Sequence, residues 1–157
     1  MTRSSLLPFL ARTPVVTFVL IPLVVAAGEL ALRGGTLALE PSWGVPLLAW
    51  GYAQYRFVGQ FRTAHGGGGP GIDKPPTRVV TEGPYRLTRN PMYLAHLIFM
   101  LGLAVTFRSY VALAILALRA IWFHRRVVAD EARLAARFGA AYTDYQARVK
   151  RWVPGVL

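Results

Sequence analysis

Cysteine is absent from this chain of 157 residues. Its absence excludes a disulfide framework, a thiolate nucleophile and any zinc or iron–sulfur site built on cysteine ligands. Acidic residues are scarce as well, because seven Asp and Glu stand against 18 Lys and Arg. The acidic residues and histidines show no metal-ligand spacing, and no Ser-His-acid set is evident. We therefore expect neither a metal site nor a serine-hydrolase centre.

Charged residues of either sign are also few, at 16% of the chain, whereas soluble domains carry about 25%. Hydrophobic residues make up 54%. This much apolar material argues against a disordered chain, and it leaves too little polar surface for a water-soluble domain. The composition predicts an integral membrane protein.

Four apolar runs are candidates for membrane-spanning helices, since a bilayer core needs about 20 such residues. The runs are Pro14–Leu32, Trp43–Phe61, Met92–Phe107 and Ser109–Phe123. Only Arg108 separates the last two, which predicts a tight helical hairpin. The fourth helix is expected to continue to about Phe138, where Gly139 ends it. The predicted fold is an all-α integral membrane protein with about four transmembrane helices, a helical hairpin and a cytoplasmic carboxyl-terminal helical extension.

We expect a single membrane-embedded domain over residues 1–157. Its predicted parts are the first two spans (1–61), a cytoplasmic loop (62–91), the helical hairpin (92–123) and the cytoplasmic carboxyl-terminal helices (124–157). Near the end, Tyr142, Tyr145 and Val149 form an amphipathic stripe at helical spacing. The stripe predicts a last short helix.

The basic residues are distributed unevenly, because 14 of the 18 precede the first run, lie in the 62–91 loop or follow Phe123. The positive-inside rule predicts that these segments, and with them both termini, are cytoplasmic. We expect anionic membrane lipids as partners and no nucleic acid, because these residues flank hydrophobic spans. The first run resembles a signal peptide, but we expect an uncleaved anchor. A composition rich in Arg, Ala and Gly suggests a bacterial inner-membrane protein.

Some features near the loop have a purely structural interpretation when taken singly. Asn90 is a good helix N-cap, and Pro91 suits the first helical position. Residues 77–81 are predicted to form a short extended piece. Arg126 and Asp130 stand at i and i+4, as in a surface ion pair.

Two motifs on either side of the hairpin change this interpretation when they are taken together. The first is Gly83-Pro84-Tyr85-Arg86-Leu87-Thr88-Arg89-Asn90-Pro91-Met92-Tyr93, and the second is Asp130-Glu131-x-x-Leu134-x-x-x-Phe138-Gly139-x-x-Tyr142-x-x-Tyr145-x-x-x-Val149. In this order they resemble the isoprenylcysteine carboxyl methyltransferase family, part of a wider group that includes phospholipid N-methyltransferases. The resemblance covers roughly residues 61–154. It implies an integral-membrane enzyme that uses S-adenosyl-L-methionine and releases S-adenosyl-L-homocysteine.

The resemblance also implies which residues form a cytoplasmic cofactor pocket. Carried over by motif, they are Thr77, Arg78, Val79, Val80, Tyr85, Asn90, Pro91, Met92, Tyr93 and Asp130. Arg126 matches an arginine that faces the methyl acceptor. Asn90 departs from the family pattern by replacing a His, although it still donates and accepts hydrogen bonds. Asp130 departs by being one methylene shorter than a Glu.

The chemistry of methyl transfer suits these residue types. Arg126 is expected to bind an acceptor carboxylate bidentately, and a dry pocket at the membrane edge favours a transfer that neutralises charge. An amine acceptor must also lose a proton, and Glu131 or His124 can assist there. The predicted catalytic residues are Arg126 and Glu131. The expected acceptor is lipophilic and enters from the bilayer, as an isoprenylcysteine-type carboxylate or a phospholipid amine.

Two other functions stay open from the sequence. The first is a membrane oxidoreductase of the steroid-reductase type, because such enzymes share a similar carboxyl-terminal architecture and use NADPH. The second is a non-catalytic membrane protein of the same fold. Among single residues, His96 is placed by its spacing either in the pocket or against a neighbouring helix. Arg56 and Arg119 either snorkel or pair, or contact a substrate headgroup.

Overall fold

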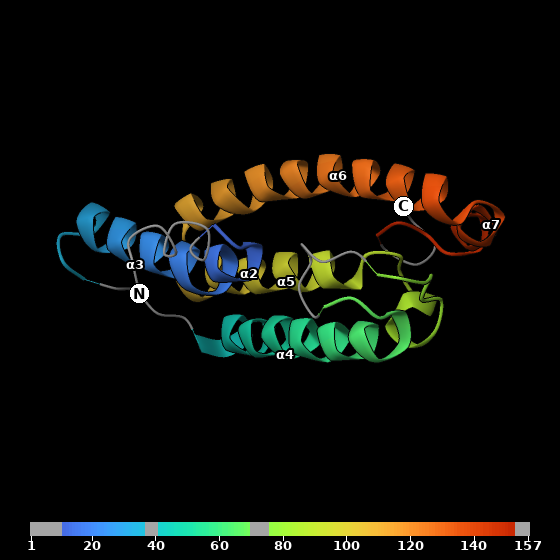
Figure 1. Cartoon of the computed structure of the whole chain (residues 1–157). Helices are drawn as coiled ribbons and strands as arrows, with labels where there is room; N and C mark the ends of the chain where they lie inside the picture. The colour runs from blue at the N-terminus through green and yellow to red at the C-terminus, as the bar shows by residue number, and fades with distance from the viewer. Residues whose placement is uncertain (1–10, 37–40, 70–75, 153–157) are drawn as a thin grey trace, which may run out of the picture. The chain divides into compact units, whose positions relative to one another are not determined.

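The computed structural model describes residues 11–36, 41–69 and 76–152, and within these ranges the ordered elements are helices, with no strand. In chain order they are α2 (Thr13–Val15), η1 (Val16–Leu20), α3 (Ile21–Leu32), α4 (Pro41–Gly66), η2 (Gly83–Arg86), α5 (Pro91–Thr106), α6 (Tyr110–Phe138) and α7 (Ala140–Arg148) (Figure 1). Element η1 is a π-helix and η2 a 3-10 helix. The predicted all-helical fold is confirmed for the described residues. Outside them lie residues 1–10, which include the basic Arg3 before the first run, and residues 37–40, the segment 70–75 of the expected loop and residues 153–157.

Each predicted span coincides with helix. Elements α2, η1 and α3 together form Thr13–Leu32, which is the one helix in the described ranges long and apolar enough to cross a membrane. Helix α5 is apolar but shorter. The spans assigned to α4, α5 and α6 therefore stay predictions, whereas their helical character is confirmed.

The turns between helices follow from local chemistry. Arg108 has a φ of 45° in the tight connection between α5 and α6. Ser109 then accepts a hydrogen bond from the Ala112 amide at 2.9 Å, which is how a serine caps a helix start. Gly139, with a φ of 54°, separates α6 from α7. The hairpin and the helix-ending glycine are as the sequence predicts.

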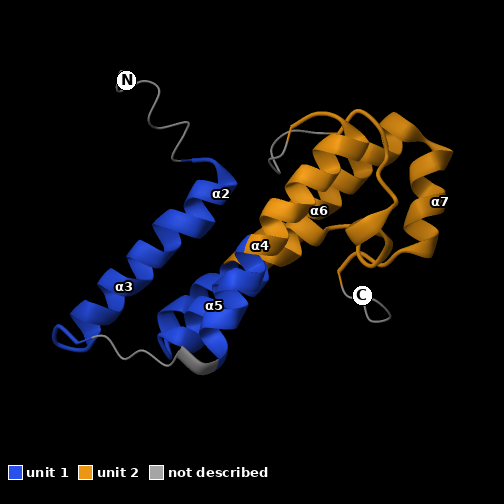
Figure 2. Ribbon diagram, turned by 90° about the horizontal axis from the view of Figure 1, so that it is seen from below, with its two compact units in different colours: residues 1–52, 96–118 blue, residues 53–95, 119–157 orange. Residues whose placement is uncertain are grey.

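The chain divides into two compact units, and the long helices contribute residues to both (Figure 2). Unit 1 contains residues 1–52 and 96–118. Unit 2 contains residues 53–95 and 119–157.

The interior of unit 1 is organised around an aromatic cluster. The Phe18 ring lies 4.8 Å from His96 and from Phe99, and 5.3 Å from Tyr52. His96 is fully buried there. Of its two predicted surroundings, the structure therefore selects the one against a neighbouring helix.

A polar cluster fixes the hairpin turn in the same unit. Glu29 is buried, forms an ion pair with Arg33 at 2.6 Å, and accepts a 2.5 Å hydrogen bond from Ser109. The Arg33 guanidinium also donates to the backbone carbonyls of Phe107 and Arg108, both at 3.1 Å. Buried charge is tolerated here because each group has a partner.

Unit 2 is held together by its carboxyl-terminal helix. Tyr142 and Tyr145 of α7 are buried, so the predicted amphipathic stripe does face the protein. The Tyr145 hydroxyl donates to the Tyr85 carbonyl at 2.7 Å, which joins α7 to η2. Gly83, with a φ of 55°, begins η2, and a Cβ atom there would lie 2.5 Å from the Phe61 ring.

Two aromatic contacts involve side chains of α6, and the first belongs to Arg119, for which the sequence left two surroundings open. The Arg119 guanidinium lies 4.6 Å from the Trp122 ring centroid and 4.8 Å from that of Phe123. Such cation–π contacts stabilise a desolvated guanidinium. Trp152 donates a hydrogen bond to His124 at 3.3 Å, so this tryptophan is bound to α6.

Candidate active site

Unit 2 encloses a cavity of about 520 Å³, within the roughly 300–1,000 Å³ usual for small-molecule sites. Five arginines and one carboxylate supply its charge. The charged lining is Arg62, Arg89, Arg126, Arg133, Arg137 and Asp130, and the remainder is Pro76, Tyr85, Asn90, Pro91, Met92, Tyr93 and Leu134. Among the described lining residues, five cationic side chains therefore surround one anionic side chain.

Seven of the twelve residues predicted from the sequence line this cavity. They are Tyr85, Asn90, Pro91, Met92, Tyr93, Arg126 and Asp130. The other five are not among its lining residues, namely Thr77, Arg78, Val79, Val80 and Glu131. The structure therefore brings together the motif before α5 and one face of α6, as expected, and leaves the 77–80 segment outside.

The 77–80 segment is attached to the end of α4. The Gly66 carbonyl accepts hydrogen bonds from the Thr77 amide and hydroxyl, both at 2.8 Å, and from the Arg78 amide at 3.2 Å. Val80 is buried, and a Cβ atom on Gly66 would lie 2.5 Å from it. The predicted extended piece is thus a bent connection held by a helix end, and the prediction that it lines the cofactor stays untested.

Helix α6 positions the charged wall of the cavity. Arg126, Asp130, Arg133 and Arg137 follow one another at i, i+4, i+7 and i+11, which is one face of an α-helix. No role was predicted for Arg133 or Arg137 from the sequence. Their helical spacing from Asp130 is the sequence signal that could have identified them as residues of the same face.

Asp130 connects the charged face of α6 to helix α5. The Tyr93 hydroxyl donates to Asp130 Oδ2 at 2.8 Å, and Arg126 Nε lies 3.9 Å from the same oxygen. Arg133 forms an ion pair with the other oxygen. The predicted i, i+4 pair is therefore present, but Asp130 is also oriented by a phenol from the opposite helix. A quarter of the Asp130 side chain stays exposed, so it can contact a ligand.

Arg126 is positioned by an aromatic ring as well as by charge. Its guanidinium carbon lies 5.3 Å from the Trp122 ring centroid, and a quarter of the side chain is exposed. A guanidinium carries a planar fork of N–H donors that matches a carboxylate or phosphate. The arrangement can therefore orient an anionic group.

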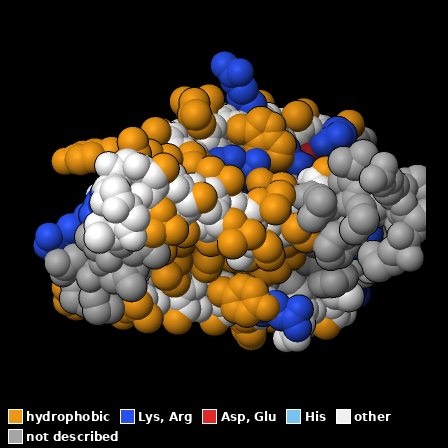
Figure 3. Space-filling view, turned by 90° about the vertical axis from the view of Figure 1, so that its left-hand side faces the viewer, with side chains coloured by type: hydrophobic (Ala, Val, Ile, Leu, Met, Phe, Trp, Pro, Cys, Tyr) orange, Lys and Arg blue, Asp and Glu red, His pale blue; other side chains and the backbone are white. Residues whose placement is uncertain are grey.

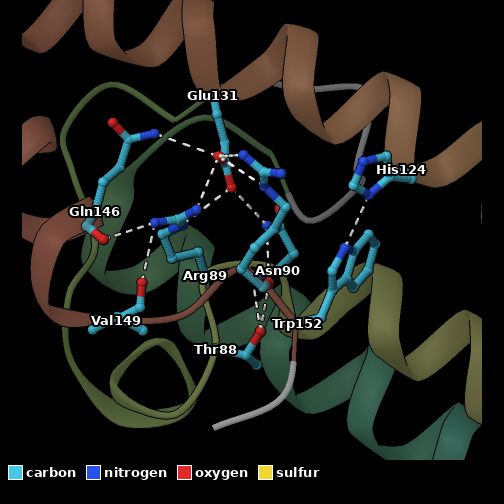
Figure 4. Close-up of polar contacts among 9 residues, drawn as sticks. Thr88, Arg89, Asn90, His124, Glu131, Gln146, Val149 and Trp152 are labelled. Carbon is cyan, nitrogen blue, oxygen red and sulfur yellow. Dashed lines mark hydrogen bonds and ion pairs between the residues drawn. The ribbon is translucent and has the colours of Figure 1, made fainter. Parts of the chain in front are cut away.

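Glu131 lies in a network of polar side chains (Figure 4), and this environment differs from that of its neighbour Asp130. It is only 3% exposed. Arg89 binds its carboxylate bidentately, with Nε and Nη2 each donating a hydrogen bond to a carboxylate oxygen at 3.1 Å. Arg151 donates to the same carboxylate at 3.0 and 3.1 Å, and Asn90 Nδ2 at 3.1 Å. The side chain predicted as a catalytic group thus holds a buried network together behind the cavity wall.

Arg89 was not assigned a role by sequence reasoning, although it stands directly before Asn90-Pro91 in the first motif. Its Nη1 donates to the carbonyls of Gln146 at 2.8 Å and Val149 at 3.1 Å. Each of its three guanidinium nitrogens therefore has a protein acceptor, so Arg89 serves the structure of the site more than it serves a ligand.

The tyrosine Tyr85 contributes a neutral polar group. Burial raises the pKa of Tyr85 to about 12, although the positive charge of Arg62 acts in the opposite direction. Burial also raises the pKa of Tyr142 and of Tyr145. All three phenols are therefore protonated at neutral pH.

The site can bind a ligand that carries both signs of charge. Its arginines suit a carboxylate or phosphate, while Asp130 suits an ammonium or a sulfonium. Among the described residues, no group of three His, Asp or Glu could hold a metal ion.

Comparison with known proteins identifies sequences similar to this part of the chain. A family model described as "Phospholipid methyltransferase" matches residues 42–141. The chain is 31% identical over 78 residues to the protein-S-isoprenylcysteine O-methyltransferase of Schizosaccharomyces pombe. It is 35% identical over 82 residues to protein-S-isoprenylcysteine O-methyltransferase B of Arabidopsis thaliana. It is also 32% identical over 78 residues to the nickel-cobalt-cadmium resistance protein NccN of Alcaligenes xylosoxydans xylosoxydans.

These matches cover about half of the chain, at 48%, 50% and 50% in the same order. They cover 33%, 41% and 37% of the relatives themselves, so the chain spans well under two thirds of each. No solved structure matches the chain significantly.

Proposed function

Because the chain belongs to the phospholipid methyltransferase family, we propose that it is an integral-membrane enzyme that transfers the methyl group of S-adenosylmethionine to a lipophilic acceptor. The observation that carries this proposal is the cavity of unit 2, where the two motifs meet. Tyr93 of the first motif donates to Asp130 of the second, and Arg126 lies beside them. The family membership also makes a nicotinamide-dependent reductase or a non-catalytic protein the weaker alternatives.

The residues of the cavity fit the cofactor in charge and size. S-adenosylmethionine carries a carboxylate, an ammonium and a sulfonium, and when bound it supplies an electrophilic methyl group. Asp130 is the proposed partner for its positive charge, with Tyr93 fixing the carboxylate through a 2.8 Å hydrogen bond. Arg133 and Arg137 are the proposed partners for its carboxylate. The cavity of about 520 Å³ is of the right order for a ligand of this size.

Arg126 is proposed to orient the acceptor. Its guanidinium carbon lies 5.3 Å from the Trp122 ring centroid, and a quarter of the side chain is exposed. The fork of N–H donors on a guanidinium matches a carboxylate. In the transfer, a carboxylate oxygen forms a bond to the methyl carbon while the bond from that carbon to sulfur breaks, leaving a neutral thioether and an ester. Two opposite charges are neutralised, so no general base is needed, and alignment of the reactants supplies much of the rate enhancement. This favours a carboxylate acceptor over a phospholipid amine.

Membrane insertion is part of the same proposal. The Thr13–Leu32 helix is long and apolar enough to span a bilayer. Hydrophobic side chains cover much of the described part of the face drawn in Figure 3. Large apolar side chains are exposed on several helices, among them Leu23, Leu32, Trp43, Trp50, Tyr110 and Leu118. Four spans, with both termini, the cavity and the basic segments on the cytoplasmic side near anionic lipids, are the arrangement we propose.

The test of this function is a calorimetric titration of the detergent-purified protein with S-adenosylhomocysteine, with NADPH titrated in parallel. We expect binding of S-adenosylhomocysteine in the micromolar range and no heat from NADPH. Binding of NADPH alone would indicate a membrane oxidoreductase of the steroid-reductase type instead. Absence of heat from both ligands would make the non-catalytic alternative the better one.

Transfer of a labelled methyl group to defined acceptors then identifies the substrate class. A farnesylated cysteine and phosphatidylethanolamine, presented in mixed micelles, separate a carboxylate from an amine acceptor. We expect label in a base-labile ester of the farnesylated cysteine. Label in the phospholipid alone would contradict the carboxylate assignment while leaving the methyltransferase assignment in place.

A further inference from the structure

Hydrogen bonds to the protein fix the orientation of the Asn90 side-chain amide. Its Nδ2 donates to Glu131 Oε1 at 3.1 Å and to the Arg151 carbonyl at 3.2 Å. A primary amide has two N–H donors, and here both are used by acceptors of the protein. The orientation of the amide is thereby defined, since a flipped amide would place its oxygen against two acceptors. The polar atom left to the cavity is Oδ1.

The acceptors that orient Asn90 are themselves fixed by the last described residues of the chain (Figure 4). Arg151 donates to Glu131 Oε2 from Nε at 3.1 Å and from Nη2 at 3.0 Å. The Thr88 hydroxyl donates to the Arg151 carbonyl at 2.9 Å, and the Arg89 amide donates to the Lys150 carbonyl at 3.0 Å. We call residues 149–151 together with Glu131 the carboxyl-terminal clamp.

We propose that the carboxyl-terminal clamp sets the Asn90 amide as a hydrogen-bond acceptor for the cofactor, which makes Arg151 and Glu131 positioning residues of the methyl-donor site. The inference rests on the proposed function and specifies one part of that site. Asn90 lines the cavity, so Oδ1 is presented to an N–H or O–H donor of the bound nucleoside or amino-acid group. The clamp acts through Asn90 and has no contact of its own with the ligand.

The same geometry argues against a proton-transfer role for Glu131. Its carboxylate accepts hydrogen bonds from Arg89, Arg151 and Asn90, and from Gln146 at 3.4 Å. Both carboxylate oxygens are thus occupied by donors of the protein, and the side chain is only 3% exposed, so a substrate group has no access to it. Glu131 is also absent from the cavity lining.

The clamp also accounts for the exchange of His for Asn at this position. A neutral imidazole has one N–H donor and one acceptor nitrogen. It can therefore donate to Glu131 and still present an acceptor, as Asn90 does. Asn90→His is expected to keep the affinity for S-adenosylhomocysteine within about threefold, whereas Asn90→Ala should weaken it about tenfold.

The first experiment measures S-adenosylhomocysteine affinity calorimetrically in the full chain. Arg151→Gln should weaken binding about tenfold, and Arg151→Lys should recover part of that loss by restoring a charge to Glu131. Arg148→Gln is the matched control, because Arg148 is exposed and its Nε contacts only the Asp144 carbonyl of its own helix. Equal affinity for the wild type and Arg151→Gln overturns the inference. Failure of the wild type to bind overturns the proposed function itself, and the inference with it.

A double-mutant comparison separates positioning through Asn90 from a general structural effect. In an Asn90→Ala background, Arg151→Gln should weaken binding no further, because the group that the clamp orients is gone. A further tenfold loss would show that Arg151 acts elsewhere and would overturn the inference. Thr88→Val gives a milder perturbation of the same carbonyl and should weaken binding about threefold in the wild-type background only.

The kinetics of Glu131→Gln separate positioning from base catalysis. A positioning role predicts that KM for S-adenosylmethionine rises with little change in kcat or in the pH profile. A lost limb of the pH profile, with unchanged affinity for S-adenosylhomocysteine, would assign Glu131 to proton transfer and overturn the inference.

Discussion

At the residue scale, Asp130 and Glu131 show how adjacent side chains acquire different surroundings. Successive residues of an α-helix point about 100° apart, so one carboxylate meets Tyr93 at the cavity and the other meets Arg89 and Arg151 behind it. The two acidic residues are adjacent in the sequence, but the helix points them in different directions. Asp130 can therefore contact a ligand, whereas Glu131 stabilises the protein behind the cavity.

Removal of the Arg126 guanidinium tests its proposed role at the acceptor. Arg126→Ala should reduce methyl transfer about a hundredfold or more, because an acceptor carboxylate would lose a charged, two-pronged partner, while S-adenosylhomocysteine affinity stays within about threefold. Calorimetry and a methyl-transfer assay on the same preparation measure both quantities. Arg125→Ala, an exposed neighbour, is the control, and normal turnover in Arg126→Ala would refute the assignment.

Ionisation of Tyr85 should destabilise the protein at high pH. The phenol is neutral in the folded and unfolded chains below its ordinary pKa of 10.0, and burial raises its pKa in the folded chain to about 12. Between these values the unfolded chain loses the proton first, so unfolding becomes more favourable by up to about 2–3 kcal/mol, at 1.36 kcal/mol per pKa unit. Thermal unfolding from pH 8 to 12 measures this loss. In Tyr85→Phe the decline above pH 10 should be shallower, and an unchanged decline would contradict the prediction.

At the element scale, small residues set the distance between α4 and α5 within unit 1. A Cβ atom on Gly102 would lie 2.8 Å from the Leu48 amide nitrogen and 3.0 Å from the Gly44 carbonyl oxygen. Backbone atoms cannot move aside as the end of a flexible side chain can. The two helices can therefore approach this closely only because residue 102 has no Cβ atom. Close helix approach through small residues is common in membrane proteins.

Gly102→Ala should therefore be destabilising, by about 1–3 kcal/mol as for an overpacked interior. Gly28→Ala is the matched control, since it is also helical but a Cβ there meets nothing within 4 Å. That substitution should be neutral or slightly stabilising, because alanine favours helix over glycine. Thermal midpoints of the two variants in the same detergent give the comparison, and an equal effect of both would count against the close contact.

At the scale of the whole molecule, the distribution of basic residues predicts the orientation in the membrane. The chain has no cysteine, so single introduced thiols report topology without background. A membrane-impermeant maleimide applied to intact cells should label Tyr110→Cys, at a residue 87% exposed beside the α5–α6 turn. Arg148→Cys on α7 should react only after permeabilisation. The reverse pattern would invert the proposed orientation.

Much of the fold could be predicted because its signals are local. Apolar runs and helical periodicity gave α5 and α6 to within a residue or two, and Gly139 marked the end of α6. Residues 77–80 were predicted at the cofactor, but the cavity lining does not include them. Their backbone is held by the Gly66 carbonyl, and no local pattern encodes this contact, since Gly66 and Thr77 are 11 residues apart in the sequence.

The sequence by itself determined the helical fold of the described chain, the family and most of the cavity lining, because these depend on residue spacing along single helices and on two motifs. Only the tertiary structure decided which partner each charge has. Asn90, Glu131 and Arg151 come from segments far apart in the chain, and they meet because α7 folds back after Gly139. The roles of Glu131 and Arg89 follow from that meeting, since the function of a buried charge depends on the groups that surround it.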